Sequence, residues 1–439
     1  MTNRSSAGHH RSRRPAGLLL AAVLAAGPAL AGCGSTAADT PTVRVTASSV
    51  RPTADPARSA EVTAGTSAFG VDLLHALTAP PDGAGRNLVL SPSGLATVLA
   101  MLLPGARGAT ADELGKALHS GLDARQYALV TGALARPVPA TDKLTLRQTD
   151  DLWTQQGLTV DPAYLDTLAT AFDAGVHPVD FAKDPAGSRR LVNTAVEKAT
   201  EGRIKDLFGE RQITSDTRLV LTDALYLKAK WATAFTPAKT SDRPFRKLDG
   251  SAPAVATMAR TGTLRYAEGS GGIVGEPWQA VELTYAEGGL AMDLIVPAQG
   301  GFTAFTKGLD QPQLDRILGA LEERSVDLTL PRFHFDTSSD LTSALRALGV
   351  RAAFDAPDFS GLAKEQLGLS TVVQKATVEV TEDGTVAAAG SGAGAGVMAA
   401  PAAPEAVELH VDRPFLFLVR DTADGRPLFL GQVTDPQAG

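Results

Sequence analysis

What the sequence has least of is the first guide to its function. It holds one cysteine, Cys33, so no disulfide can form within a single chain. Its 7 histidines lack the close spacing that zinc sites need, and we expect no metal and no other cofactor. Nothing resembles the GxSxG setting of a nucleophilic serine, so we do not expect an enzyme. Basic residues do not cluster after the first fifteen positions and the net charge is -7, which argues against a nucleic-acid partner.

The N-terminal apolar run, residues 16–31, is short for a membrane span. It follows Arg11, Arg13 and Arg14, and basic residues before a short apolar run are typical of a signal peptide. We therefore predict a signal peptide over residues 1–32 and a location outside the cytoplasm.

The end of this run, Leu30-Ala31-Gly32-Cys33, resembles the bacterial lipobox. The resemblance implies cleavage before Cys33 and acylation of its thiol, which would anchor the protein to the cell membrane. The alternative is ordinary cleavage after a small residue, which leaves a secreted protein with an idle thiol. Residues 33–66 are rich in Ala, Thr, Ser and Pro and bury little surface, so we predict a disordered tether.

The remainder of the chain, residues 67–436, mixes helical and strand patterns without a second linker. Phe69, Leu73, Leu74 and Leu77 have helical spacing. Alternation of apolar and polar residues predicts strands at residues 325–335 and 371–381, and Asp424-Gly425 favours a terminal hairpin. We interpret this part as one large α+β domain.

Several segments of this domain resemble the serpin family, in family order and spacing. They are 87–96 (NLVLSPSGLA), 193–204 (NTAVEKATEGRI), 219–231 (ending LKAKW), 378–389 (VEVTEDGTVAAA), 412–418 (DRPFLFL) and 429–436 (FLGQVTDP). The resemblance implies a large central β-sheet that accepts an inserted reactive loop, two further sheets and surrounding helices. It also implies a monomeric suicide inhibitor of serine or cysteine proteases, with the target held as a covalent acyl complex.

The reactive loop is expected at about residues 382–404. By resemblance its hinge is Glu382, Asp383, Gly384, Thr385, Val386, Ala387, Ala388 and Ala389. In the family, the residue before the cut lies about sixteen positions beyond the hinge glutamate, which places the bait bond at Met398–Ala399, with Val397 and Ala400 as near alternatives. Methionine is flexible and suits a medium apolar pocket, so elastase-, subtilisin- or chymotrypsin-like targets are expected.

The composition of the loop fits insertion. Residues 385–396 carry no charge, no proline and nothing larger than valine. In a strand, all the later glycines lie on one face, which would slide beneath a covering element. The alternative is a plain flexible Gly/Ala linker.

Under the opening sheet, serpins carry polar residues known as the shutter. Ser91 fits that pattern, but Gly94 stands where a second serine is usual, Asp223 where asparagine is usual and Gln374 where histidine is usual. A buried aspartate needs donors, so we expect the Gln374 amide to donate to Asp223. Trp231 is expected near the top of the same sheet.

Two other functions remain open from the residues alone. One is a serpin fold without inhibition, acting as a carrier, a chaperone or a mere substrate. The other is an envelope lipoprotein that binds a solute or another protein.

Overall fold

The computed structural model describes residues 42–43, 45–47, 53, 55–79, 83, 85–136, 138–270, 275–385 and 406–438. All of them belong to one compact unit, Thr40–Gly439. Cys33, the predicted signal peptide, hinge residues 386–389 and the predicted bait bond Met398–Ala399 lie outside the described residues.

The central sheet has six strands among the described residues. Their order is β10 (Phe333–Asp340), β11 (Leu369–Val380), β12 (Gly384–Thr385), β4 (Leu219–Lys230), β2 (Leu144–Gln155) and β3 (His177–Val179). β11 pairs directly with β4, in parallel, from Leu369 to Thr377. Beyond that point the short β12 lies between the two strands. The sheet is thus closed at one end and begins to separate at the other.

A second sheet of nine strands packs against the first. Its order is β1 (Leu88–Leu90), β15 (Pro427–Val433), β14 (Phe415–Asp421), β8 (Leu290–Pro297), β7 (Trp278–Thr284), β6 (Ala254–Gly269), β9 (Glu322–Pro331) and β13 (Val407–His410), with β5 (Ser241–Pro244) on β6. The two further sheets expected from the sequence are joined here, because the long β6 pairs with β5 and β9 and, through its last residues, with β7.

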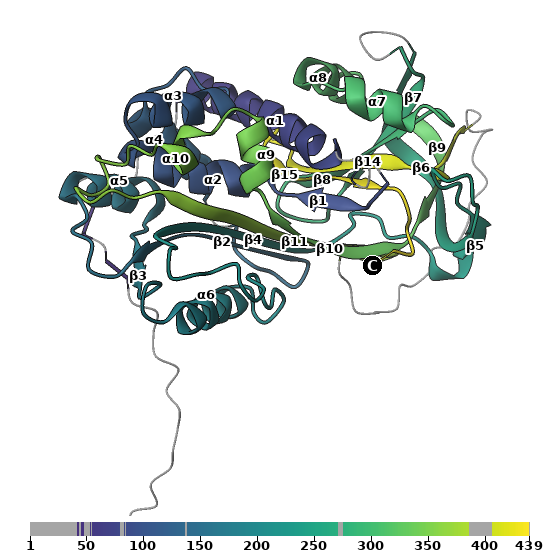
Figure 1. Ribbon diagram of the computed structural model, residues 1–439. Helices are drawn as coiled ribbons and strands as arrows, with labels where there is room; N and C mark the ends of the chain where they lie inside the picture. Colours follow the sequence, from purple (N-terminus) through teal and green to yellow (C-terminus); the bar gives the residue numbers. More distant parts are fainter. Residues whose placement is uncertain are drawn as a thin grey trace, which may run out of the picture. The chain divides into compact units, whose positions relative to one another are not determined.

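Helices lie on both faces of the central sheet (Figure 1). On one face are α1 (Pro56–Thr78), α2 (Pro92–Leu102), α3 (Gly108–Ala117), α4 (Ala124–Leu134), α5 (Pro162–Phe172), α9 (Thr342–Ala347) and α10 (Ala352–Asp355). On the other is α6 (Pro185–Ala199), while α7 (Phe302–Gly308) and α8 (Gln311–Gly319) lie beside the second sheet. The predicted α+β class is confirmed.

Buried side chains form three clusters that fix these layers. One joins the helical face to the central sheet and includes Leu99 of α2. The second lies between the two sheets, where Leu225 of β4 and Phe417 of β14 both pack. The third includes Trp153 of β2 and Val196 of α6. β4 is therefore buried on both faces, which explains its long and mostly apolar run.

The first helix corrects the predicted tether boundary. α1 begins at Pro56 and not near Ser67, and the Asp55 side chain caps it by accepting hydrogen bonds from backbone amides. Small residues let this part of the helix pack closely against its neighbours. A Cβ on Gly65, for example, would lie only 2.8 Å from the Leu118 carbonyl oxygen. Upstream, Val43 exchanges backbone hydrogen bonds of 2.8 and 3.0 Å with Val176. Low bulk had suggested disorder, but it serves close packing here.

Another correction concerns residues 325–335, which were predicted as one strand. β9 ends at Pro331 and β10 begins at Phe333, and the two strands belong to different sheets. The alternation changes phase at the break, from the even residues Val326, Leu328 and Leu330 to the odd residues Phe333 and Phe335, and both sets pack in the shared core. This change of phase was the sequence signal that one strand ends and another begins.

A buried ion cluster spans β14, β8 and β7. Arg420 donates to Asp293 at 2.7 Å and also contacts Glu282, which in turn accepts from Arg265 at 3.1 Å. Burial raises the pKa of Asp293 to about 6, although Arg420 acts in the opposite direction. Arg420 therefore balances the negative charge of both buried carboxylates, Asp293 and Glu282.

Replacing Arg420 by Met keeps the bulk of the side chain but leaves two buried carboxylates without their main partner. We expect the free energy of unfolding to fall by about 3–5 kcal/mol, measured by denaturant unfolding. The control Arg324→Met breaks an exposed pair with Glu322 and should cost about 0.5 kcal/mol or less. Equal losses in the two variants would contradict the assigned role.

Candidate functional site: the hinge and shutter of the central sheet

The hinge begins where the chain leaves β11 and turns back. The Thr381 amide donates to the Gly384 carbonyl at 2.9 Å, closing a tight turn. Thr385 then pairs antiparallel with Val380 of β11 and with Ala229 of β4. The first residues of the predicted hinge thus already occupy a place inside the sheet.

Gly384 is required by this geometry. Its φ is +153°, and a Cβ there would overlap the Ala229 carbonyl oxygen. The Thr385 side chain that follows is fully buried, and its hydroxyl lies 2.7 Å from the Tyr285 hydroxyl. The turn therefore needs a glycine followed by a small polar residue.

Trp231 holds the turn at the top of β4. Its ring stacks on Tyr285 with centroids 4.6 Å apart. The indole Nε1 donates to the Thr381 carbonyl at 3.0 Å, and the Trp231 amide donates to the Asp383 carbonyl at 2.9 Å. The structure thus brings Trp231 together with the predicted hinge.

Glu382 is anchored from the side by residues that the sequence did not single out. Its carboxylate accepts from Arg332 Nε at 2.9 Å and from the Thr240 hydroxyl. Burial would raise the pKa of Glu382, but the hydrogen bonds from Arg332 and Thr240 outweigh it, and the pKa is lowered. Arg332 is the residue between β9 and β10, and only the break in the strand could have pointed to it.

Gln374 is the centre of the shutter, at the closed end of the seam between β11 and β4. Its Oε1 accepts from the Ser91 amide, and its Nε2 donates to the Ser91 carbonyl, both at 2.9 Å. Nε2 also donates to Asp223 Oδ2, which is the contact expected from the sequence. One amide therefore links α2, β4 and β11.

Gly94 and Asp223 account for each other. A Cβ on Gly94 would overlap the Asp223 carboxylate, so the serine usual at this position does not fit beside this aspartate as placed. The Gly94 amide instead donates to the Ser91 hydroxyl at 3.1 Å, which caps α2. These two departures from the family pattern form a matched pair.

Asp150 of β2 also belongs to this site, although sequence reasoning missed it. It is the direct cross-strand partner of Asp223. Burial raises the pKa of both carboxyls, that of Asp150 well above its usual range and that of Asp223 to about 6. The sequence held a signal of this, because Asp150 lies on the same face of its strand as Leu146, Gln148 and Leu152.

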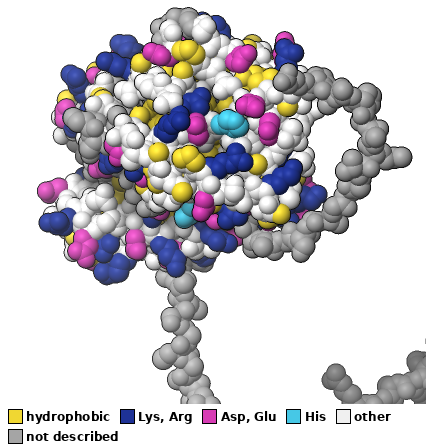
Figure 2. All heavy atoms as spheres, turned by 90° about the vertical axis from the view of Figure 1, so that its right-hand side faces the viewer, with side chains coloured by type: hydrophobic (Ala, Val, Ile, Leu, Met, Phe, Trp, Pro, Cys, Tyr) yellow, Lys and Arg dark blue, Asp and Glu magenta, His cyan; other side chains and the backbone are white. Residues whose placement is uncertain are grey.

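The described residues contain no group of three or more His, Cys, Asp and Glu side chains that could hold a metal. Within the same ranges, no helix combines the length and apolarity that crossing a bilayer requires. On the side where β5, β6 and β9 lie, acidic and basic side chains are interspersed (Figure 2). The contacts described above at the hinge and the shutter are strand pairing, hydrogen bonds and packing.

A central sheet in which a two-residue strand lies between two longer ones at one end, packed against a second sheet and flanked by helices, defines the structural class of this protein. Comparison with known sequences specifies the class: residues 64–436 match the model of the Serpin (serine protease inhibitor) family. The chain belongs to the serpin family.

Similar proteins are found in organisms that are only distantly related to one another. A serpin-like protein of Thermococcus kodakarensis is 34% identical over 360 residues, covering 81% of this chain and 82% of its own. Iripin-2 of Ixodes ricinus is 33% identical, covering 85% and 93%. Plasminogen activator inhibitor 1 of Neovison vison is 34% identical, covering 80% and 88%. Among solved structures, native protease nexin-1 with heparin matches with a TM-score of 0.76 at 26% identity, covering 87% of this chain and 100% of its own.

The pairing of Gly94 with Asp223 is open to a direct test. Gly94→Ser restores the usual family residue and should lower the free energy of unfolding by about 1–3 kcal/mol through overpacking. The same change in an Asp223→Ala background should cost less, because the overlapping carboxylate is gone. The control is Gly115→Ser in α3, where a Cβ meets no atom within 4 Å. Additive losses for the Gly94 and Asp223 changes would refute the pairing.

Proposed function

We propose that this serpin inhibits proteases by trapping: a protease cuts the reactive loop, and the loop then inserts between β11 and β4. One observation carries the proposal, the placement of Thr385 between Val380 and Ala229. Strand addition is favourable there because β11 and β4 already flank the entering chain on both sides.

The register of the hinge gives the side-chain pattern of an inserted loop. Thr385 pairs with Ala229, so odd residues of the loop would lie beside odd residues of β4. Even residues of β4, such as Val220 and Ala224, pack in the cluster beneath α6. The even loop residues would therefore slide under α6, and the last four of these are glycines: Gly390, Gly392, Gly394 and Gly396. A plain linker gives no reason for this match.

The same register brings a polar residue to the shutter. Counting six steps from Thr385 gives Ser391, and six steps back from Ala229 gives Asp223. Six steps back from Val380 gives Gln374, so both neighbours agree. The hydroxyl of Ser391 would enter between Asp223 and Gln374 and replace the hydrogen bond that insertion breaks.

The proposed bait bond is Met398–Ala399, and the proposed targets are serine proteases with a medium apolar specificity pocket, such as elastase-like or subtilisin-like enzymes. Inhibition as the function is supported by a relative that is named as an inhibitor, plasminogen activator inhibitor 1. The acyl complex would form one to one, with the serpin acting as a monomer.

Incubation with an elastase-like or subtilisin-like protease should give a covalent complex that survives SDS gel electrophoresis. Thr385→Arg should abolish the complex while cleavage continues, since a charged side chain cannot occupy this buried position. Ser241→Arg, on the exposed strand β5, is the matched control and should leave complex formation unchanged.

Cleavage should also raise the melting temperature of the wild-type protein, because insertion adds a paired strand to the sheet. Clipping without a complex and without this rise would instead show a non-inhibitory serpin. That outcome would favour the carrier or chaperone alternative.

We further propose that the protein is exported and anchored through a lipid on Cys33. The lipobox-like sequence that ends at Cys33 supports this. Cys33→Ser should move the protein from the membrane fraction to the soluble fraction of the expressing cells, with the inhibitory activity of the body unchanged. Equal membrane association of both forms would exclude the anchor.

A further inference from the structure

Three polar side chains form one row across the central sheet. Asp150 of β2 lies opposite Asp223 of β4, which lies beside Gln374 of β11. Gln148 donates to Asp150 Oδ2 at 2.6 Å, and Gln374 donates to Asp223 Oδ2. The Oδ1 atoms of both aspartates are buried, and no N–H or hydroxyl of the described protein reaches them. Each carboxyl group therefore has one satisfied and one unsatisfied oxygen.

Asp150 and Asp223 are direct cross-strand neighbours, and each has a buried Oδ1 atom without a donor. Two charged carboxylates have no hydrogen to place between them, and two like charges in a buried site repel strongly. One proton shared by the pair removes both problems, since it satisfies both oxygens and leaves a single charge. We propose that Asp150 carries this proton and donates it to Asp223, and that the proton helps to keep the sheet closed.

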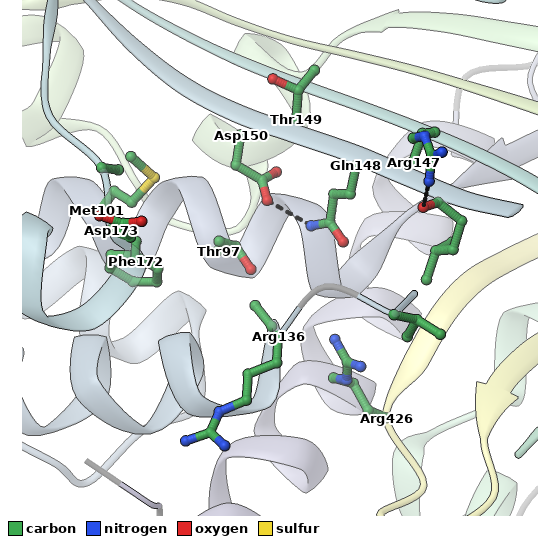
Figure 3. Close-up of a pocket in the computed structure, with 14 residues that line it drawn as sticks. Thr97, Met101, Arg136, Arg147, Gln148, Thr149, Asp150, Phe172, Asp173 and Arg426 are labelled. Carbon is green, nitrogen blue, oxygen red and sulfur yellow. Dashed lines mark hydrogen bonds between the residues drawn. The ribbon is translucent and has the colours of Figure 1, made fainter. Parts of the chain in front are cut away.

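The neighbouring charges favour protonation at Asp150. Asp151, next along β2, adds repulsion. Arg426 is the cation that faces Asp150 across a cavity of about 450 Å³ (Figure 3), but it also lies 4.0 Å from Asp424. Arg147 is paired with Glu201 at 2.9 Å. The cavity is further lined by Arg136 and Asp173.

Asp223 is the better site for the negative charge. It accepts from Gln374, and a charged acceptor makes that hydrogen bond stronger than a neutral one would. The proton on Asp150 thus strengthens the link between β4 and β11. The arrangement also explains why Asp223 is tolerated although it is 1% exposed.

Loss of the proton would place a second charge beneath the closed sheet. Opening the seam between β4 and β11 lets water reach Asp223 and relieves that charge. Rising pH should therefore promote opening. This last step rests on the proposed insertion mechanism, whereas the shared proton does not.

The proton can be observed without any protease. At about pH 8, where ordinary carboxyls are ionised, the infrared spectrum of the intact protein should show the C=O stretch of a protonated carboxylic acid. The band should be absent from Asp150→Asn, an isosteric variant that still donates to Asp223. Asp151→Asn removes a neighbouring carboxylate and should keep the band. No protonated band in the wild type, or an unchanged band in Asp150→Asn, overturns the proposal.

The pH dependence tests the link to opening. The pKa of Asp150 is raised on folding, so its contribution to stability is present at low pH and is lost as the pH rises through the folded value. The wild type should lose melting temperature as the pH rises through that folded value and should take up a peptide of sequence 385–396 faster over the same range. Asp150→Asn should show neither trend, and Asp151→Asn should show both.

The two experiments separate the possible failures. A protonated band with a flat rate of peptide uptake would refute the control of opening but keep the shared proton. Peptide uptake that never occurs at any pH would count against insertion itself, and so against both the proposed function and the control of opening.

Discussion

The seam between β11 and β4 is the constraint on which the rest of the structure depends. These strands pair directly over one end, and the Gln374 amide fastens them there to Ser91 and Asp223. At the other end the turn at Gly384 keeps them apart. The two ends differ in what lies between the strands. Side-chain hydrogen bonds of Gln374 join them at one end, and Gly384 and Thr385 lie between them at the other.

Much of this could be predicted from the sequence, because local chemistry dictated it. Ser91-Pro92 caps a helix, and Asp424-Gly425 turns a hairpin, whatever lies around them. The contact from Gln374 to Asp223 could be expected for a similar reason, since a buried carboxylate must find donors. The sequence alone did not indicate that Asp150 of β2 is the cross-strand neighbour of this carboxylate.

The parts that escaped prediction depend on spatial neighbours distant in the sequence. Gly94 departs from the family pattern, and only the structure shows that the Asp223 carboxylate occupies the space a serine side chain would need. Arg332 was predicted inside one strand, but it lies between β9 and β10, which belong to different sheets and pack in one shared core. The helical start at Pro56 was hidden by a composition that is equally typical of linkers. In each case the structure depends on contacts with residues that are distant in the sequence.

The pairing of Val43 with Val176 determines where the leading segment of the chain joins the body. Val176 directly precedes β3, whose partner on β2 runs beside the first residues of β4. This entry point lies at the end of the sheet opposite the hinge (Figure 1). Val43 lies ten residue steps after Cys33, a reach of at most about 35 Å. A protein tethered through Cys33 would therefore present its uncut bait outward, and a captured enzyme carried along β4 would be drawn back toward the lipid surface.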